Sequence, residues 1–220
     1  HKDDAYIFGF GWIHSAFPTQ GPDKAILDAI IPDIPAYFLS IDYHSCWVNS
    51  KALEIAEINK HSPDPNGGHI ERYPNSMEPL GCLREMSAIR LVTTKLPQPT
   101  KRDWKDALRT YMKKAAENGI TSVFDAGVLN TDQWTAFHAA KELDDKGELS
   151  IRLCSSYVCD PQQGVKQLSD ILHARDMFCH GNNFKVAVAK LFMDGAVEGH
   201  TGFLLEPYQD RKDYRGAPIW

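Results

Sequence analysis

The second half of the chain alternates between helical and strand-like patterns, and this alternation most limits the fold. Helices are expected to start near Thr100, Thr131 and Pro161, the first with Asp103 placed as in a capping box. Strands are expected at 120–125, 149–158 and 184–193. Strand starts roughly 30 residues apart suit right-handed βαβ units and a parallel sheet. A doubly wound sheet and a (β/α)8 barrel both fit, but no G-x-G-x-x-G follows these strands, which argues against a dinucleotide-binding fold.

The first half of the chain lacks this alternation. We expect a strand at 36–41, a helix capped by Asn49 or Ser50, a strong turn at 62–68 and a helix at 80–91. Residues 33–98 are therefore predicted to form an insertion or lid subdomain. Residues 1–32 would lead into the barrel, and 99–220 would supply its βα units, ending after the strand that carries Lys190.

Composition and charge limit the classes of partner. The chain has 220 residues, 43% of them hydrophobic, with 24 basic and 29 acidic side chains and a net charge of -5. This is a globular composition without a basic block, which argues against binding to nucleic acid or an anionic membrane. No apolar stretch approaches the roughly 20 residues of a membrane span, and no secretory leader is visible. We expect a cytoplasmic protein with a small-molecule substrate and leave a homodimer open.

Five cysteines, an odd number, give no C-x-x-C pair, so a metal finger is a poor fit and buried free thiols are preferred. They are Cys46, Cys82, Cys154, Cys159 and Cys179. The chain starts without Met at His1 and stops at Trp220 without a polar tail. Both ends are expected to be cuts through a longer protein, whose remaining part would then be a partner of this chain.

Lys190 stands where a core residue is expected, near the end of an apolar, strand-like run. A buried ammonium is costly unless it is paired, neutralised or modified. It could pair with Asp194 or Glu198. A desolvated lysine could instead attack a substrate carbonyl as a neutral amine, or capture carbon dioxide to form a carbamate that bridges two divalent metals. At the C-terminal end of a barrel strand, Lys190 would point into the active site.

Several runs resemble the third family of the amidohydrolase superfamily, which includes N-substituted formamide deformylases. Residues 190–202 (K-L-F-M-D-G-A-V-E-G-H-T-G) resemble its signature, and 42–53 (D-Y-H-S-C-W-V-N-S-K-A-L) resemble its D-G-H-x-x-W-V-N-S-x-A-L segment, with Tyr43 in place of glycine. Shorter matches occur, in the family's order, at 9–12, 63–68, 81–85 and 119–125. Each motif alone is weak, but their shared order along nearly the whole chain is specific.

The resemblance implies a (β/α)8 TIM-barrel metallohydrolase that acts on amide- or formamide-like carbon–nitrogen bonds. It implies that Lys190 is carboxylated and bridges two metals, usually zinc, and that a metal-bound hydroxide attacks the substrate carbonyl. It places five candidate substrate-binding residues near the pocket, namely His44, Glu85, Asp194, Glu198 and His200. The family's H-x-H pair and its later histidine and aspartate ligands are not among the 220 residues, so this chain alone should be inactive and no residue in it is assigned as catalytic with certainty.

Other interpretations stay open at this stage. Lys190 could be a Schiff-base lysine in a metal-free barrel lyase, or the chain could be an inactive scaffold or binding fragment. His44 could be a packed, hydrogen-bonded histidine, and Glu85 could lie on a solvated helix face.

Overall fold

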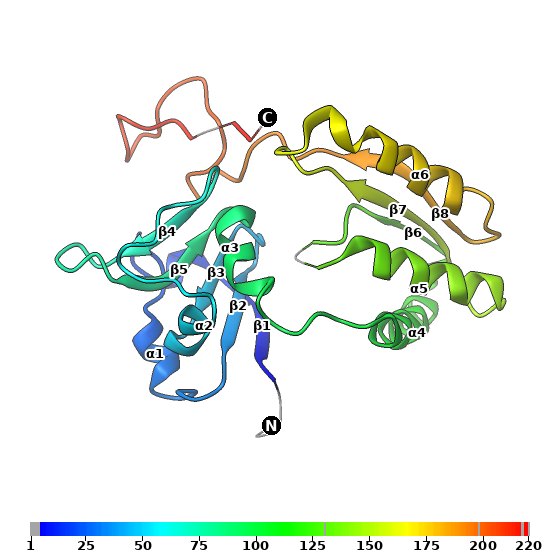
Figure 1. Ribbon diagram of the computed structural model, residues 1–220, viewed down its shortest axis with the longest axis horizontal. Coiled ribbons are helices and arrows are strands. Elements are labelled where there is room, and N and C mark those ends of the chain that lie inside the picture. The colour runs from blue at the N-terminus through cyan, green and yellow to red at the C-terminus, as the bar shows by residue number, and fades with distance from the viewer. Residues whose placement is uncertain (1–4, 130, 198, 217, 220) are drawn as a thin grey trace. The chain divides into compact units, whose positions relative to one another are not determined.

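The computed structural model describes residues 5–129, 131–197, 199–216 and 218–219. The chain forms two compact units (Figure 1). The first comprises His1–Pro97 and Met193–Trp220, and the second comprises Gln98–Phe192. Both units combine helices and strands, which confirms the mixed α/β class.

The first unit is organised around a five-stranded sheet in the order β1-β2-β3-β5-β4. Its strands are β1 (Ile7–Trp12), β2 (Ala36–Ser40), β3 (Ser45–Val48), β4 (His69–Arg72) and β5 (Pro79–Arg84). Strands β1 and β2 pair in parallel, and the other pairs are antiparallel. Because β1 and β2 are neighbours, residues 1–32 and 33–98 share one sheet instead of forming separate bodies.

The helices of the first unit are short, and α1 and α2 start at side-chain caps. They are η1 (His14–Ala16), α1 (Lys24–Asp28), α2 (Ser50–Ile55) and α3 (Glu85–Thr93). Asn49 caps α2, as the sequence predicts, by accepting a hydrogen bond from the amide of Ala52. Apolar side chains of α2 and α3 pack with those of β2, β3, β4 and β5 in one buried cluster.

The prediction of a helix at 80–91 is wrong for residues 80–84. Residues 79–84 form β5, which lies between β3 and β4 and is buried along its whole length. Helix α3 begins only at Glu85. A short apolar run cannot be assigned to helix or strand by periodicity alone, and pairing with two distant neighbours decides the outcome here.

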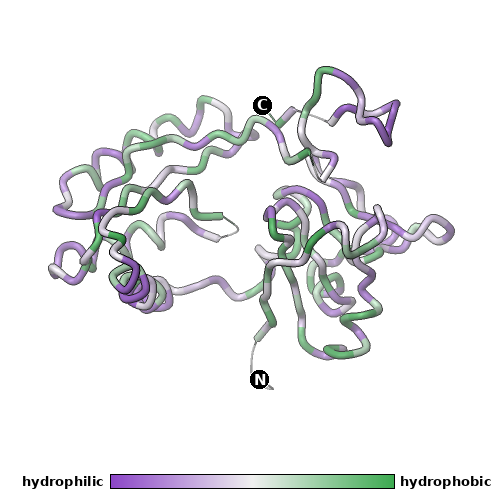
Figure 2. Tube along the Cα trace, turned by 180° about the vertical axis from the view of Figure 1, so that it is seen from behind, coloured by the Kyte–Doolittle hydropathy of each residue, from purple (hydrophilic) through white to green (hydrophobic). Residues whose placement is uncertain are grey.

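The second unit follows the predicted order of helix and strand. It contains α4 (Lys101–Glu117), β6 (Ser122–Asp125), α5 (Gln133–Asp145), β7 (Arg152–Val158), η2 (Gly164–Gln167), α6 (Leu168–Phe178) and β8 (Phe184–Lys190). The strands pair in parallel in the order β6-β7-β8. Thr100 and Asp103 form the predicted capping box at the start of α4. Most of α4 is hydrophilic (Figure 2) and only a few of its side chains reach the core.

Several boundaries in the second unit differ from the predictions. Strands β6 and β7 begin at Ser122 and Arg152 rather than at 120 and 149. Asp132, not Thr131, caps α5, because its carboxylate accepts hydrogen bonds from the amides of Trp134 and Thr135. The helix expected from Pro161 starts as the short η2, and α6 proper begins at Leu168. The last strand ends at Lys190 rather than at 193.

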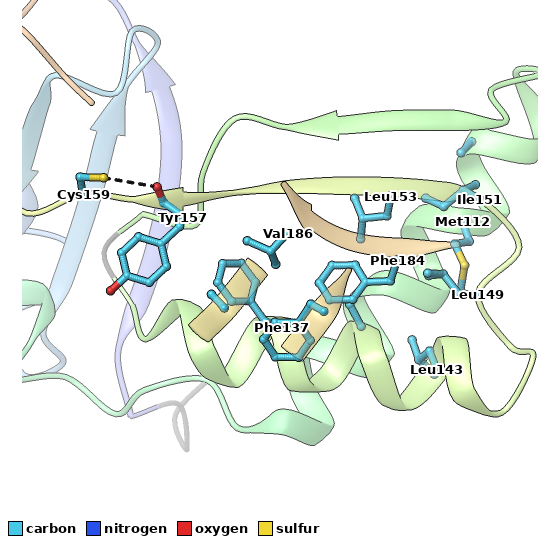
Figure 3. Packing of buried hydrophobic residues seen from close by; sticks show 14 residues of the cluster. Met112, Phe137, Leu143, Leu149, Ile151, Leu153, Tyr157, Cys159, Phe184 and Val186 are labelled. Atoms are coloured by element: carbon cyan, nitrogen blue, oxygen red, sulfur yellow. Dashed lines mark hydrogen bonds between the residues drawn. The ribbon is translucent and has the colours of Figure 1, made fainter. Parts of the chain in front are cut away.

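The core of the second unit lies on one face of its sheet (Figure 3). Leu153 and Tyr157 of β7 and Phe184 and Val186 of β8 pack against side chains of α4, α5 and α6 in a single cluster. Phe124 points to the opposite face, because it pairs in register with Cys154, and it is 58% exposed. Helices therefore cover one face of this parallel sheet and leave apolar surface on the other.

The described cysteines are free thiols, as expected from the sequence. Cys46, Cys82 and Cys159 are buried as predicted, whereas Cys154 is half-buried and Cys179 is exposed. None of the described helices is both long enough and apolar enough to cross a bilayer.

Candidate functional site

A β-bulge determines which way Lys190 faces. In the register of β7 with β8, Ser155 pairs with Val186 and Ser156 pairs with Val188, so Ala187 is an extra residue. Val186 points into the helix-covered core. Without the bulge, Lys190 would point to the same face of the sheet as Val186, because alternate residues of a strand share a face. The extra residue reverses this alternation, so Lys190 points to the opposite face. Lys190 therefore lies at the C-terminal end of β8 on the face that the helices leave uncovered.

Lys190 is partly buried and has an aromatic neighbour. Its Nζ lies 4.7 Å from the centre of the Phe192 ring. Among the described residues of the second unit, no carboxylate comes within ion-pair distance of its ammonium. Of the two partners that the sequence left open, Asp194 belongs to the first unit and Glu198 lies outside the described residues. The strand end thus presents a lysine whose charge is not neutralised by a described neighbour of its own unit.

In the first unit, His44 and Glu85 form a close pair. Both carboxylate oxygens of Glu85 lie 3.1 Å from Nδ1 of His44, and the amide of Glu85 donates a 2.8 Å hydrogen bond to the carbonyl of His44. Glu85 is 6% exposed. The interpretation of Glu85 as part of a solvated helix face is therefore wrong: strand β5 ends against β3, which holds the first residue of α3 next to His44.

Backbone strain flanks this pair. Tyr43 has φ 65° and Glu85 has φ 65°, both in the left-handed region that favours glycine. The family that this sequence resembles has glycine at the position of Tyr43, and the left-handed conformation explains that preference. Unfavourable backbone conformations of this kind persist where surrounding contacts hold them, and they concentrate at functional sites.

Asp42 holds the turn before His44. Its carboxylate accepts hydrogen bonds from the Ser40 hydroxyl at 2.5 Å and from the His44 amide at 3.0 Å, and it lies 3.3 Å from Nε2 of His14. Although burial opposes the change, these hydrogen bonds keep the pKa of Asp42 below its ordinary value. Sequence analysis assigned no role to Asp42 or His14. The Asp-x-His spacing, which allows the aspartate to bond the backbone two residues on, is the signal that could have identified the turn.

A cavity of about 480 Å³ lies beside Glu85 within the first unit. Its lining includes Gly68, Arg84, Glu85, Gly195, His200 and Thr201. Gly195 is needed here, because a Cβ at this position would lie 2.5 Å from Oε1 of Glu85 and would also meet Thr201. The backbone of Gly195 therefore packs directly against the Glu85 carboxylate.

The remaining predicted site residues lie around this turn. Nε2 of His200 is 2.7 Å from Oδ2 of Asp210. Asp194 accepts a 2.9 Å hydrogen bond from the amide of Phe203 and is close enough to His44 for its charge to act there. The structure thus brings together His44, Glu85, Asp194 and His200.

Electrostatics favour a protonated His44. Its hydrogen bond with Glu85 raises the pKa of the imidazole, and the charges of Glu85, Asp42 and Asp194 raise it further, against the opposing effect of burial.

A second charged group lines the same cavity. Arg84 donates to Glu71 at 2.5 Å, and both side chains are buried. His69 lies 2.5 Å from Asp64 and 3.6 Å from Glu71, and these two neighbouring carboxylates, Glu71 first, raise its pKa. Sequence analysis did not single out these four residues, which are brought together by the pairing of β4 with β5.

Within the described part of the chain, no three His, Cys, Asp or Glu side chains are grouped so as to hold a metal ion. Lys190 is the metal ligand that the sequence predicts, and a single side chain does not make a metal centre.

Comparison with known proteins agrees with the resemblance. The amidohydrolase family matches residues 1–219. The exoenzymes regulatory protein AepA of Pectobacterium carotovorum subsp. carotovorum is 27% identical over 213 residues, covering 94% of this chain and 45% of that protein. N-substituted formamide deformylase of Arthrobacter pascens is 34% identical over 112 residues, covering 50% of this chain and 20% of that protein.

A solved structure shares the fold. The crystal structure of an uncharacterized metal-dependent hydrolase from Pyrococcus horikoshii OT3 superposes with a TM-score of 0.60 at 23% identity, covering 99% of this chain and 40% of that one. The chain spans less than half the length of these relatives. Since the family match extends over nearly all of the 220 residues, this chain belongs to the amidohydrolase family.

Proposed function

We propose that the protein is a metal-dependent hydrolase that cleaves carbon–nitrogen bonds of amide- or formamide-like substrates. The observation that carries this proposal is the family match over residues 1–219. Similarity to a protein named N-substituted formamide deformylase supports the choice of bond, and similarity to a structure titled as a metal-dependent hydrolase supports the need for metal.

The complete protein would be a (β/α)8 barrel with an inserted lid. The sheet β6-β7-β8 supports this proposal, because its strands are parallel and its helices lie on one face only. A barrel wall has this construction, whereas a doubly wound sheet carries helices on both faces. The first unit would contain the lid, with its cavity serving the substrate.

Lys190 fits the role of a carboxylated ligand that bridges two metal ions, proposed to be zinc. It lies at the C-terminal strand end where barrels carry their chemistry, and no described carboxylate of its own unit neutralises it. A carbamate would give this side chain two anionic oxygens, which an ammonium lacks. When bound, the metals would act as Lewis acids on the substrate carbonyl. The other ligands would come from the rest of the full-length protein.

The first unit would bind the substrate through His44, Glu85, Asp194, Glu198 and His200. Glu85 and His200 line the cavity of about 480 Å³, a size that suits a small molecule, and His44 is hydrogen-bonded to Glu85. His44 would donate a hydrogen bond to a substrate oxygen, and the glycine-rich turn at 195–202 would close against it.

A non-catalytic role is the second candidate, because one relative is named as a regulatory protein. Such a protein would keep the cavity of the first unit as a binding site but would need neither metal nor a modified Lys190.

The test uses the full-length protein and its Lys190→Ala variant. Metal content is measured by plasma mass spectrometry, and ¹³C NMR is recorded after growth with ¹³C-bicarbonate. Hydrolysis of N-butylformamide and N-butylacetamide is followed by release of butylamine. We expect bound zinc, a carbamate carbon signal and butylamine release, all lost in Lys190→Ala.

Lys185→Ala is the matched control, because Lys185 lies on the same strand and pairs with Cys154, which faces away from the core. This variant should retain all three signals. A full-length protein that binds no metal and shows no carbamate would contradict the proposal and favour the regulatory role.

A further inference from the structure

Glu85 lines the cavity of the first unit and is paired with His44. We infer that Glu85 is a positioning residue that fixes His44 with Nδ1 protonated, so that Nε2 is the atom that donates to a substrate oxygen. This inference refines the substrate-binding role proposed above and rests on it for its kinetic readout.

The geometry of the pair sets the proton arrangement. An ionised carboxylate can only accept hydrogen bonds, so the two 3.1 Å contacts from Glu85 require a proton on Nδ1 of His44. Among the described residues, Nε2 of His44 has no hydrogen-bond partner. Glu85 thus uses both of its oxygens on one nitrogen and leaves the other nitrogen for an external group.

The main chain strengthens this arrangement. The amide of Glu85 donates to the carbonyl of His44 while its side chain accepts from Nδ1, so the two residues are joined at two points. Glu85 is held at φ 65°, a conformation that is unfavourable for a residue other than glycine and persists only where surrounding contacts hold it.

The 195–201 turn restrains Glu85 from the other side. A Cβ at Gly195 would come within 2.5 Å of Oε1, so the carboxylate is confined between this backbone and the imidazole. The turn therefore contributes to the orientation of His44 without touching it.

The surrounding charges favour the cationic form of the imidazole by raising its pKa. Glu85 on α3, Asp42 on the turn between β2 and β3, and Asp194 before the glycine turn all raise the pKa of His44, while His14 faces the far side of Asp42. A cationic Nε2–H donates a stronger, shorter hydrogen bond than a neutral one and favours an oxygen that carries or develops negative charge.

The experiment uses the full-length protein labelled with ¹⁵N-histidine, with the His44 signal assigned by its loss in His44→Gln. Glu85→Gln keeps the shape of the side chain and removes its charge, and Glu85→Asp keeps the charge and shortens the side chain. We expect the NMR titration of His44 to move to lower pH in Glu85→Gln and to stay above the ordinary histidine value in Glu85→Asp. Gly195→Ala, which displaces Glu85 without removing a titratable group, should shift the titration in the same direction as Glu85→Gln.

The kinetic arm measures kcat/KM for N-butylformamide across pH. His44→Gln should lose about a hundredfold, as expected for a donor to a developing oxyanion. Glu85→Gln should retain activity at acidic pH and approach His44→Gln as the pH rises, because the alkaline limit follows the lowered pKa of His44. An equal loss at every pH would indicate a purely structural role and overturn the inference.

The two arms separate this inference from the proposed function. An unchanged His44 titration in Glu85→Gln overturns the positioning role whatever the activity. If no probe is hydrolysed by the wild-type protein, the proposed hydrolase activity fails, and the NMR titration alone decides whether Glu85 controls His44.

Discussion

The two compact units are stabilised in different ways. In the second unit, a single apolar cluster fills the space between three helices and one face of a parallel sheet. The first unit also buries an apolar cluster, but more of its buried side chains are polar than in the second unit, which buries Asp144, Ser155, Ser156 and Gln167. Asn49, Glu71, Arg84 and Glu85 bond to residues 13 or more positions away in the sequence. Apolar burial is non-directional and tolerates variation, whereas buried polar groups must each find a partner.

The largest expected effect is in the apolar cluster of the second unit. Phe137→Ala should cost about 3–5 kcal/mol of unfolding free energy, because Phe137 is fully buried among Phe178 and Phe184. Urea unfolding with hydrogen exchange measures this. Amides of β6–β8 should lose protection, and those of β1–β5 should keep theirs.

Phe124→Ala is the control, because Phe124 lies on the exposed face of the same sheet and its loss should change stability by no more than about 0.5 kcal/mol. Equal loss of protection in both units after Phe137→Ala would show that they unfold together, which would remove the distinction drawn here.

The next effect is in the hydrogen-bonded framework of the first unit. Asn49 accepts from the amides of Ala36 and Ala52 and donates to the carbonyls of Ile31 and Ile34. Asn49→Ala leaves these buried groups unpaired and should cost about 2–3 kcal/mol, measured by chemical denaturation. Ser50→Ala, at an exposed neighbouring position, should cost less than about 1 kcal/mol. A loss for Asn49→Ala as small as that for Ser50→Ala would mean that water replaces the lost bonds.

Stability of the first unit should depend on pH in both directions. The folded-state pKa of His44 and of His69 is raised, so their contribution is complete below about pH 6.5 and is lost as the pH rises through the raised values. The folded-state pKa of Asp42 and of Glu71 is lowered, so their contribution is present above about pH 4.3 and is lost as the pH falls. Thermal unfolding between pH 3 and 9 should show greatest stability of this unit in the weakly acidic range. His44→Gln should reduce the loss of stability at alkaline pH. If the loss is unchanged in that variant, groups other than His44 cause it.

The smallest effect concerns backbone strain beside His44. Tyr43→Gly should stabilise the protein by up to about 1 kcal/mol, because glycine adopts the left-handed conformation without steric cost. The loss of the exposed stack between Tyr43 and Phe10, at 6.1 Å, offsets part of this gain. Glu57→Gly isolates the backbone contribution, since Glu57 is also left-handed at φ 58° but lies exposed after α2. If Tyr43→Gly destabilises the protein while Glu57→Gly stabilises it, the aromatic contact outweighs the strain.

Local signals in the sequence predicted much of the second unit. The Thr100–Asp103 capping box, the spacing of apolar residues in α4 and the order of helices and strands all depend on residues close together in the chain. Boundaries failed where neighbouring residues offer similar chemistry, as with Thr131 and Asp132. In the first unit, residues 80–84 were predicted as helix but form β5, because this strand pairs with β4 and with β3, whose residues lie far away in sequence.

The candidate site divides in the same way. The sequence by itself determined the family motifs, the residue types available for chemistry and the position of Lys190 near the end of a strand. Only the tertiary structure decided that a bulge at Ala187 turns Lys190 to the uncovered face, and that Glu85 is buried against His44 rather than exposed on a helix. The reason is physical: helix caps and periodicity act over a few residues, whereas strand register, burial and the pKa of an ionisable group are set by partners that folding brings from elsewhere in the chain.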